Sequence, residues 1–480
     1  MDGSPRVSCV TPVRRVAGKS VTTLEGLEPE VSWVFTDAFC ATGASQCGFC
    51  TPGILMRLAA LREKKPGAGE QDVKTALAAH LCRCTGWNTI HDAFVLARDR
   101  LDGTMCSAPP ARERDLEVAA RRAAIEGRNP QSVGPEVASG LGGFADDLAP
   151  EDSLVAVPDG SGGWTVAPTL TAARAKAGKV QGRNSGVKVT WPLDIPDGDW
   201  AVALATTFVE PAYLEPDSSW CPPGGEPVSP LANGGAFGAK RASLVTAAAR
   251  QLADEQAVPV RVLLSREDVV RLGPKRPPIA AGLRADGSGT VRVGRTPGSG
   301  DLSTWIERFG SVAPGVTIEV VEIQGPPVSA ELRGAGWAEA TILLAAIDST
   351  LGGDGSPAVE ACSPEGGRAR VSLSDGCFSV RVDAGAVLDE VVLRSYCIGA
   401  VHQALGWVTR EAVAVGPAGD VLDLTIRSFG VLPARETPQI EVEVVHSDAP
   451  AVNGSDAVFA AAAAAVWIAA GLVARWPTTG

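Results

Sequence analysis

Two short stretches decide the fold, QCGFCTPG at residues 46–53 and HLCRCTGW at residues 80–87. They place Cys47, Cys50, Cys82 and Cys84 as a C-x2-C pair, a gap of 31 residues and a C-x-C pair. Four thiolates from two loops can converge on one soft metal centre, and the usual occupants are an iron–sulfur cluster or a zinc ion. The tight C-x-C spacing and the long gap favour a [2Fe–2S] cluster, while a zinc-stapled interaction module stays open as an alternative.

Helical patterns adjoin both cysteine loops. Thr51 and Pro52 suit the N-cap and first position of a helix whose apolar stripe continues to about residue 64. Further helices are predicted over about residues 71–81 and from about residue 89. Two antiparallel helices of similar length bring the loop before the first and the loop after the second to the same end. The pattern therefore predicts that the four thiols meet.

The rest of the chain has short alternating segments mixed with longer apolar ones, which predicts an α+β region over residues 151–480. Residues 1–25 look strand-like, and residues 106–150 look like a linker with a helix over about 112–127. The later strands are expected at 153–157, 187–191, 201–208, 258–264, 316–323, 378–382 and 440–445. The later helices are expected at 243–255, 338–351, 388–405 and 457–474.

Composition limits the function classes. The chain has 480 residues and a net charge of −12, which argues against nucleic-acid or anionic-membrane partners. Eleven cysteines are too few for a disulfide scaffold of this length, and no apolar leader is visible, so a cytoplasmic location is expected. Residues 457–474 approach the minimum length of a membrane span, but their alanine content favours a buried helix.

The cysteine motifs resemble the helical [2Fe–2S] domain of the xanthine dehydrogenase/aldehyde oxidase family of molybdenum hydroxylases, over about residues 30–100. The resemblance implies that the four cysteines are cluster ligands and that Gln46 lies beside the pyranopterin. It implies four parts: residues 1–28 as a remnant of a plant-type ferredoxin domain, 29–105 as a small all-α four-helix [2Fe–2S] domain, 106–150 as a linker, and 151–480 as a shortened molybdenum-cofactor-binding domain. The ferredoxin-like remnant carries only one of that domain's cysteines, Cys9, so we expect Cys9 to be an ordinary thiol.

A second set of motifs resembles the molybdenum-binding subunit of the same family. NGGAFGAK at residues 233–240 is similar to the glycine-rich loop beside the molybdenum, which implies cofactor-binding roles for Gly234, Gly235, Phe237 and Gly238. ELRGAGWAEA at residues 331–340 implies that Arg333 is a pocket residue. Arg241 stands where purine-oxidising relatives have an acid, which argues against xanthine as the substrate.

This sequence differs from the family pattern at the position of the catalytic carboxylate. The resemblance places the glutamate that acts as general base on Ser455, within VNGSDAVF at residues 452–459. Asp456 is adjacent and is the candidate replacement base, with helix capping as its structural alternative. Ala335 stands where relatives place an aromatic residue over the substrate.

The resemblance implies an oxidoreductase that hydroxylates an aldehyde or an N-heterocycle, with water as the oxygen source and electron transfer through the [2Fe–2S] cluster. It also implies a molybdopterin cofactor, a separate FAD-binding subunit as electron acceptor, and a homo- or hetero-oligomer. The alternative is a catalytically silent electron-transfer or assembly subunit of such a complex. The missing glutamate, Ala335 and the shortened core favour that alternative.

Overall fold

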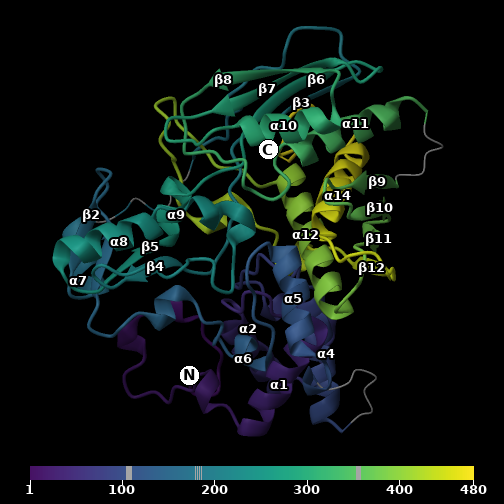
Figure 1. Cartoon of the computed structure of the whole chain (residues 1–480). Coiled ribbons are helices and arrows are strands. Elements are labelled where there is room, and N and C mark those ends of the chain that lie inside the picture. The colour runs from purple at the N-terminus through teal and green to yellow at the C-terminus, as the bar shows by residue number, and fades with distance from the viewer. Residues whose placement is uncertain are drawn as a thin grey trace.

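A helical domain lies at one end of the molecule, and the larger region beyond it holds three β-sheets, one of which packs against a pair of long helices (Figure 1). The computed structural model describes residues 1–103, 111–178, 180, 182, 184, 186–352 and 358–479. The helices of the first domain are α1 (Pro29–Thr42), α2 (Thr51–Lys64), α3 (Glu70–Ala76) and α4 (Asn88–Leu101). The prediction of an all-α domain followed by an α+β region is confirmed.

Two of the three helices predicted around the cysteines have nearly the predicted bounds, α2 and α4. The predicted helix over 71–81 is shorter, because α3 ends at Ala76 and a turn leads into the second cysteine loop. The sequence reasoning did not identify α1, whose buried face packs against α4 in the core of this domain.

The strand-like prediction for residues 1–25 is wrong. This segment forms three short 3₁₀ turns and pairs with no described strand. Leu24 is its one buried side chain up to residue 28. A strand needs a partner ladder and a face to bury, and this segment has neither in the described part of the chain.

Three four-stranded sheets form the larger region. The first has the order β2-β1-β5-β4, the second β3-β6-β7-β8 and the third β12-β11-β10-β9. The strands are β1 (Leu154–Pro158), β2 (Trp164–Ala167), β3 (Val202–Ala205), β4 (Asp217–Cys221), β5 (Val260–Leu264), β6 (Ile279–Leu283), β7 (Gly289–Arg295), β8 (Val316–Glu322), β9 (Val359–Cys362), β10 (Arg368–Ser374), β11 (Cys377–Asp383) and β12 (Ile440–Val445). The remaining helices are α5 (Leu116–Gly127), α6 (Pro135–Ala138), α7 (Leu170–Ala177), α8 (Val245–Gln256), α9 (Arg266–Leu272), α10 (Ser303–Val312), α11 (Trp337–Thr350), α12 (Glu390–Thr409), α13 (Ile426–Phe429) and α14 (Ser455–Ala469).

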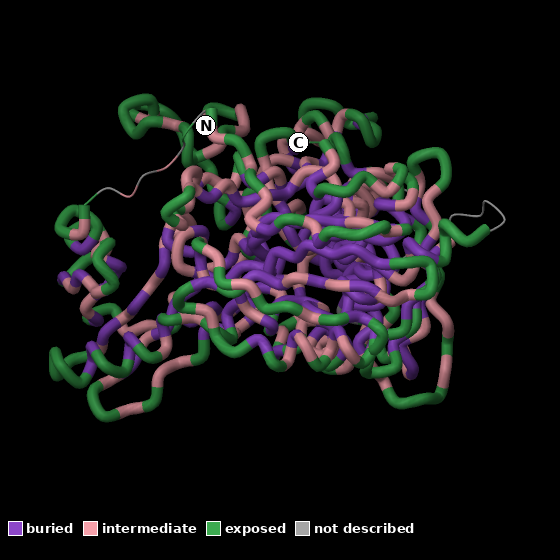
Figure 2. The backbone as a smooth tube through the Cα atoms, turned by 90° about the horizontal axis from the view of Figure 1, so that it is seen from above, coloured by how far each residue is buried: buried purple, intermediate pink, exposed green. Residues whose placement is uncertain are grey.

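The long helices α12 and α14 occupy the centre. α14 packs against α12, α11 and the strands β9 and β10, and its run of alanines from 460 to 465 is fully buried. Small side chains let these elements approach closely, and buried residues concentrate in this region (Figure 2). No helix in the described residues is long and apolar enough to cross a membrane.

The segment predicted as a linker is packed structure from residue 111 onward. Arg114 forms an ion pair with Asp389 at 2.6 Å, before the start of α12. Arg122 of α5 is fully buried, where it pairs with Glu126 and donates to the Val452 carbonyl at 2.7 Å. These contacts tie the segment to α12 and α14, so the linker prediction is wrong there, while residues 104–110 lie outside the described ranges.

Candidate metal centre

The four predicted cysteines come together in two pairs. Cys47 and Cys50 lie before α2, and Cys82 and Cys84 lie between α3 and α4. The sulfurs of Cys47 and Cys84 are 3.8 Å apart, and the thiols of Cys50 and Cys82 are hydrogen-bonded to each other. No three His, Cys, Asp or Glu side chains of the described residues converge on one point where a single ion could bind. Each pair takes one thiol from each loop, an arrangement that four cysteine ligands can offer to a two-iron cluster.

The pKa values of the thiols in the two loops are shifted in opposite directions, because the hydrogen bonds with Cys82 and Cys47, together with burial, raise the pKa values of Cys50 and Cys84 well above the usual value. Hydrogen bonds from the Cys50 thiol and from Thr85, whose hydroxyl is 3.0 Å from the Cys82 sulfur, lower the pKa of Cys82 to about 6. The thiolate is the ligand in metal and cluster sites. The donor set therefore fits a [2Fe–2S] cluster with Cys47, Cys50, Cys82 and Cys84 as its ligands.

Close backbone packing holds the two loops in place. Gly48 has φ +83°, and a side chain there would collide with the Val137 carbonyl of α6. Gly399 of α12 lies so close to the Cys84 carbonyl that an added Cβ would overlap it. The second cysteine loop thus rests directly on α12.

One face of α12 contacts the cysteine loops through residues spaced four apart, Ser395, Gly399 and Gln403. Gln46 Nε2 donates to the Cys84 carbonyl at 3.1 Å and to the Ser395 hydroxyl at 3.0 Å. Gln403 Nε2 donates to the Arg83 carbonyl at 3.4 Å. Gln46 thus lies against the cluster ligands, and its contact with a pterin stays a prediction.

Arg83 is a structural residue of the site that sequence reasoning missed. It lies between two ligand cysteines, is buried, and forms an ion pair with Glu411, with 2.8 Å between Nη2 and Oε2. Its Nε donates to the Pro211 carbonyl at 2.8 Å. A charged residue between two ligand cysteines was the available signal, but its partner lies 328 residues away in the sequence.

Arg333 is the centre of a second cluster beyond Gln403. Its Nη1 donates to Gln403 Oε1 at 3.0 Å, its Nε donates to Asp456 Oδ1 at 2.8 Å, and its Nη2 donates to the Ser455 hydroxyl. Arg128 Nη2 donates to the other carboxylate oxygen of Asp456 at 2.8 Å. The structure therefore brings together the pocket residue and the candidate base that the resemblance implied.

Asp456 does not cap a helix. The caps at the start of α14 come from Asn453, which accepts from the Asp456 N–H, and from Glu126, which accepts from Gly454 and Ser455 N–H. Both carboxylate oxygens of Asp456 instead accept from guanidinium groups. These two contacts pair the carboxylate with positive charge and leave one lone pair on each oxygen, so the role of Asp456 as general base stays a prediction.

The glycine-rich loop contacts Arg333, but other parts of the same chain fill the space beside its glycines. The Phe237 carbonyl accepts from the Arg333 N–H at 2.9 Å. An added Cβ at Gly234 would approach Glu215 to 2.8 Å, and one at Gly235 or Gly238 would overlap Asn129 or the Glu331 carbonyl. These glycines are required by the packing of the chain on itself.

The cavity between this loop, Arg333 and Asp456 has a volume of about 140 Å³. Pockets for cofactor-sized ligands begin at about 300 Å³. The residues as placed therefore do not accommodate a molybdopterin, and we assign no reaction step to that group.

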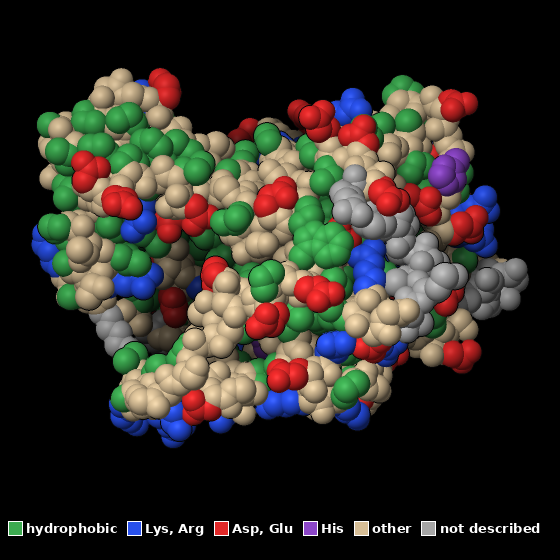
Figure 3. Space-filling model, turned by 90° about the horizontal axis from the view of Figure 1, so that it is seen from below, with side chains coloured by type: hydrophobic (Ala, Val, Ile, Leu, Met, Phe, Trp, Pro, Cys, Tyr) green, Lys and Arg blue, Asp and Glu red, His purple; other side chains and the backbone are tan. Residues whose placement is uncertain are grey.

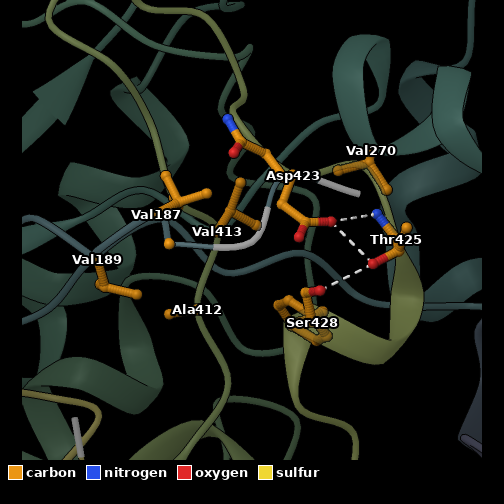
Figure 4. A pocket seen from close by; sticks show the side chains of 12 residues that line it. Val187, Val189, Val270, Ala412, Val413, Asp423, Thr425 and Ser428 are labelled. Carbon is orange, nitrogen blue, oxygen red and sulfur yellow. Dashed lines mark hydrogen bonds between the residues drawn. The ribbon is translucent and has the colours of Figure 1, made fainter. Parts of the chain in front are cut away.

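A second cavity, of about 250 Å³, is lined by other residues (Figure 4). Valine side chains line it, among them Val187 and Val189, from the segment that was predicted as a strand and pairs with none. On its polar side Asp423 accepts from the Thr425 N–H and hydroxyl at 2.8 Å. None of the sequence-predicted site residues lines this cavity.

Comparisons with known proteins agree with the cysteine geometry. Residues 23–95 match the family model of the [2Fe-2S] binding domain. A probable xanthine dehydrogenase subunit from Bacillus subtilis (strain 168) is 38% identical over 103 residues, which is 22% of this chain and 60% of that protein. The nicotine 6-hydroxylase small subunit of Paenarthrobacter nicotinovorans is 41% identical over 95 residues, 20% of this chain and 58% of that protein. The chain thus spans less than two thirds of the length of these curated relatives.

The whole chain also resembles solved structures. The aldehyde oxidoreductase from Desulfovibrio gigas superposes with a TM-score of 0.67 at 12% identity, covering 99% of this chain and 93% of that one. The enzyme from Desulfovibrio desulfuricans ATCC 27774 gives a TM-score of 0.67 at 14% identity, covering 97% and 91%. Identities this low show a shared fold alone.

Residues 23–95 therefore match a [2Fe–2S] binding domain and are similar to the same part of xanthine dehydrogenase relatives, and the chain as a whole shares the fold of the aldehyde oxidoreductases. The family resemblance inferred from the cysteine motifs is confirmed, and the match favours a cluster over a zinc module at those motifs. Some of the relatives are named as subunits, which is consistent with multi-subunit complexes in this family.

Proposed function

We propose that this chain carries electrons through a [2Fe–2S] cluster within an oxidoreductase of the molybdenum hydroxylase type. The observation that supports the proposal best is the arrangement of the four thiols in two pairs, on loops fixed by α12 and by the buried Arg83–Glu411 pair. When bound, the cluster supplies a one-electron redox centre. The chain's own residues hold it with four thiolates and exclude water from Cys47 and Cys82, which are buried.

A route for coupling the cluster to a second redox centre follows α12. Gln403 contacts the Arg83 carbonyl, which lies between two ligand residues, and also contacts Arg333. Two hydrogen bonds through one amide thus join the cysteine loop to the Arg333 cavity. A redox group seated at that cavity, on this chain or on a partner, would be within the same hydrogen-bonded network.

The test is an iron inventory of the chain purified anaerobically. We expect about two irons and two sulfides per chain and visible absorption that bleaches on reduction. Cys82→Ser should lose the iron, while Cys377→Ser, which alters a half-buried cysteine outside the loops, should keep it. A folded chain that holds zinc, or holds no iron in the wild type, would contradict the proposal.

A second candidate is that the chain itself hydroxylates an aldehyde or an N-heterocycle and passes the electrons to an FAD-binding subunit. The aldehyde oxidoreductase fold of the whole chain and the meeting of Arg333, Ser455 and Asp456 favour it. It requires the Arg333 cavity to enlarge for a cofactor. Molybdenum and pterin in protein from the native host, with turnover lost in Asp456→Asn, would support this candidate, whereas iron alone would support electron transfer.

A further inference from the structure

The first cysteine loop presents an aromatic ring at the surface. Phe49 lies between the ligands Cys47 and Cys50, and 48% of it is exposed. Its ring packs edge to face on Phe144, with 6.1 Å between centroids and planes at 79°. A protein that covered this ring would lie within two residues of two cluster ligands.

The segment that follows α6 extends this surface. A Cβ added to Gly140 would be 2.9 Å from Pro52 of α2, and one added to Gly142 would be 3.2 Å from the Cys47 carbonyl, so the segment lies directly on the cysteine loop. Leu141 and Leu148 on this segment are 71% and 56% exposed. Large exposed apolar side chains grouped in this way are typical of interaction sites.

The border of this surface is acidic. Residues 131–152 contain five carboxylates and no Lys or Arg. Glu136, Asp147, Glu151 and Asp152 are exposed or half-buried. Burial and the nearby Asp146 raise the pKa of Asp147, which shows like charges crowded together. Figure 3 views the molecule from the side of the helical domain, where acidic, basic and hydrophobic side chains are interspersed.

We propose that this loop face, formed by Phe49, Leu141 and Leu148 with the carboxylates Glu136, Asp147, Glu151 and Asp152, docks a redox protein whose electron-carrying group is surrounded by Lys and Arg. The proposal rests on the proposed function, because it needs the cluster. In the step it serves, the reduced cluster gives one electron to the partner's oxidised group and returns to its oxidised state. No bond forms or breaks, and no proton moves.

Charge complementarity decides the kind of partner. Arg261 pairs with Asp146 at 3.4 Å, which leaves the four other carboxylates of the border in excess. An excess of carboxylates repels an acidic protein and steers a basic one, while the apolar centre excludes water from the contact. The chain's own N-terminal segment, residues 1–22, is also basic, with four Lys or Arg against one Asp. A second copy is therefore the competing occupant. The position of Phe49 between two ligands favours the redox partner.

The experiment follows oxidation of the reduced, cluster-loaded chain by cytochrome c, a basic one-electron acceptor, in a stopped-flow instrument. The double variant D147K/E151K should transfer electrons about tenfold more slowly at low salt and lose most of the salt dependence. The matched control E441K/D448K makes the same change of charge at exposed positions on and after β12 and should stay within about twofold of the wild type. Leu141→Ser should also slow transfer, unlike Leu351→Ser at another exposed leucine.

Three outcomes overturn the proposal or its basis separately. If D147K/E151K keeps the wild-type rate with full iron content, the loop face is not the docking site. If sedimentation shows a wild-type dimer that D147K/E151K dissociates, a second copy occupies the face. If the wild type holds no iron, the proposed function fails before docking is tested.

Discussion

His402 of α12 shows how one buried side chain makes stability depend on pH. Its Nε2 lies 3.1 Å from the Leu432 carbonyl, and its Nδ1 has no partner in the described structure. Burial and the nearby Arg83 lower the pKa of His402 to about 3, so the folded chain keeps the ring neutral. The unfolded chain binds a proton near pH 6.5.

We therefore expect the contribution of the neutral His402 ring to the free energy of unfolding to be fully present above pH 6.5. This contribution should be lost as the pH drops towards 3. At pH 5 the contribution of His402 to this loss is about 2 kcal/mol, from 1.36 kcal/mol per pH unit. Urea unfolding at pH 7.5 and pH 5 would measure it. His402→Gln should remove this part of the pH dependence, and an unchanged dependence would show that other groups cause it.

Asp456 and Arg333 show the limit of residue-level inference. The sequence motifs identified both as site residues, and the structure places them in contact. The motifs could not show that Arg128 occupies the second carboxylate oxygen, because Arg128 lies 328 positions earlier in the sequence. The chemistry of Asp456 is therefore set by a neighbour that no local pattern identifies.

At the scale of elements, α12 is the support of the site. Its face with Ser395, Gly399 and Gln403 contacts both cysteine loops and the Arg333 cluster. Sequence periodicity predicted the existence of the helix but not this role. The middle of α12 is buried on nearly all sides. Its sequence therefore has no single apolar stripe that would mark the face in contact with the cysteine loops.

Gly399→Ala tests this support. The added Cβ would overlap the Cys84 carbonyl, and backbone cannot move away cheaply, so we expect a loss of about 1–3 kcal/mol in stability and a lower iron content. The matched control is Gly310→Ala in α10, where no neighbouring atom lies within 4 Å of an added Cβ. That change should stabilise the chain by about 0.5–1 kcal/mol. Equal effects of the two changes in urea unfolding would contradict the packing argument.

At the scale of the whole molecule, a buried ion pair joins the helical domain to the larger region. Arg83 comes from the second cysteine loop, and Glu411 follows α12 and is fully buried. Burial raises the pKa of Glu411, and the Arg83 charge opposes that rise. Each charge depends on the other because neither reaches water.

Glu411→Ala should cost about 3–5 kcal/mol in unfolding free energy, because Arg83 would remain buried without its partner. The control Glu360→Ala removes an exposed pair with Arg370 and should cost less than about 1 kcal/mol. Denaturant unfolding measures both, and iron content reports whether the cysteine loop shifts. A similar small cost for both variants would show that the buried pair does not hold the domains together.

The sequence by itself determined the local features of this protein. The cysteine spacing, the helix starting at Thr51 and six of the twelve strands described in the α+β region follow from short-range patterns, because thiol spacing, capping and periodicity act over a few residues. Only the tertiary structure decided the rest. It pairs Cys47 with Cys84, joins Arg83 to Glu411 and closes the glycine loop with distant groups. These contacts join residues far apart in the chain, and packing, which local patterns do not encode, selects them.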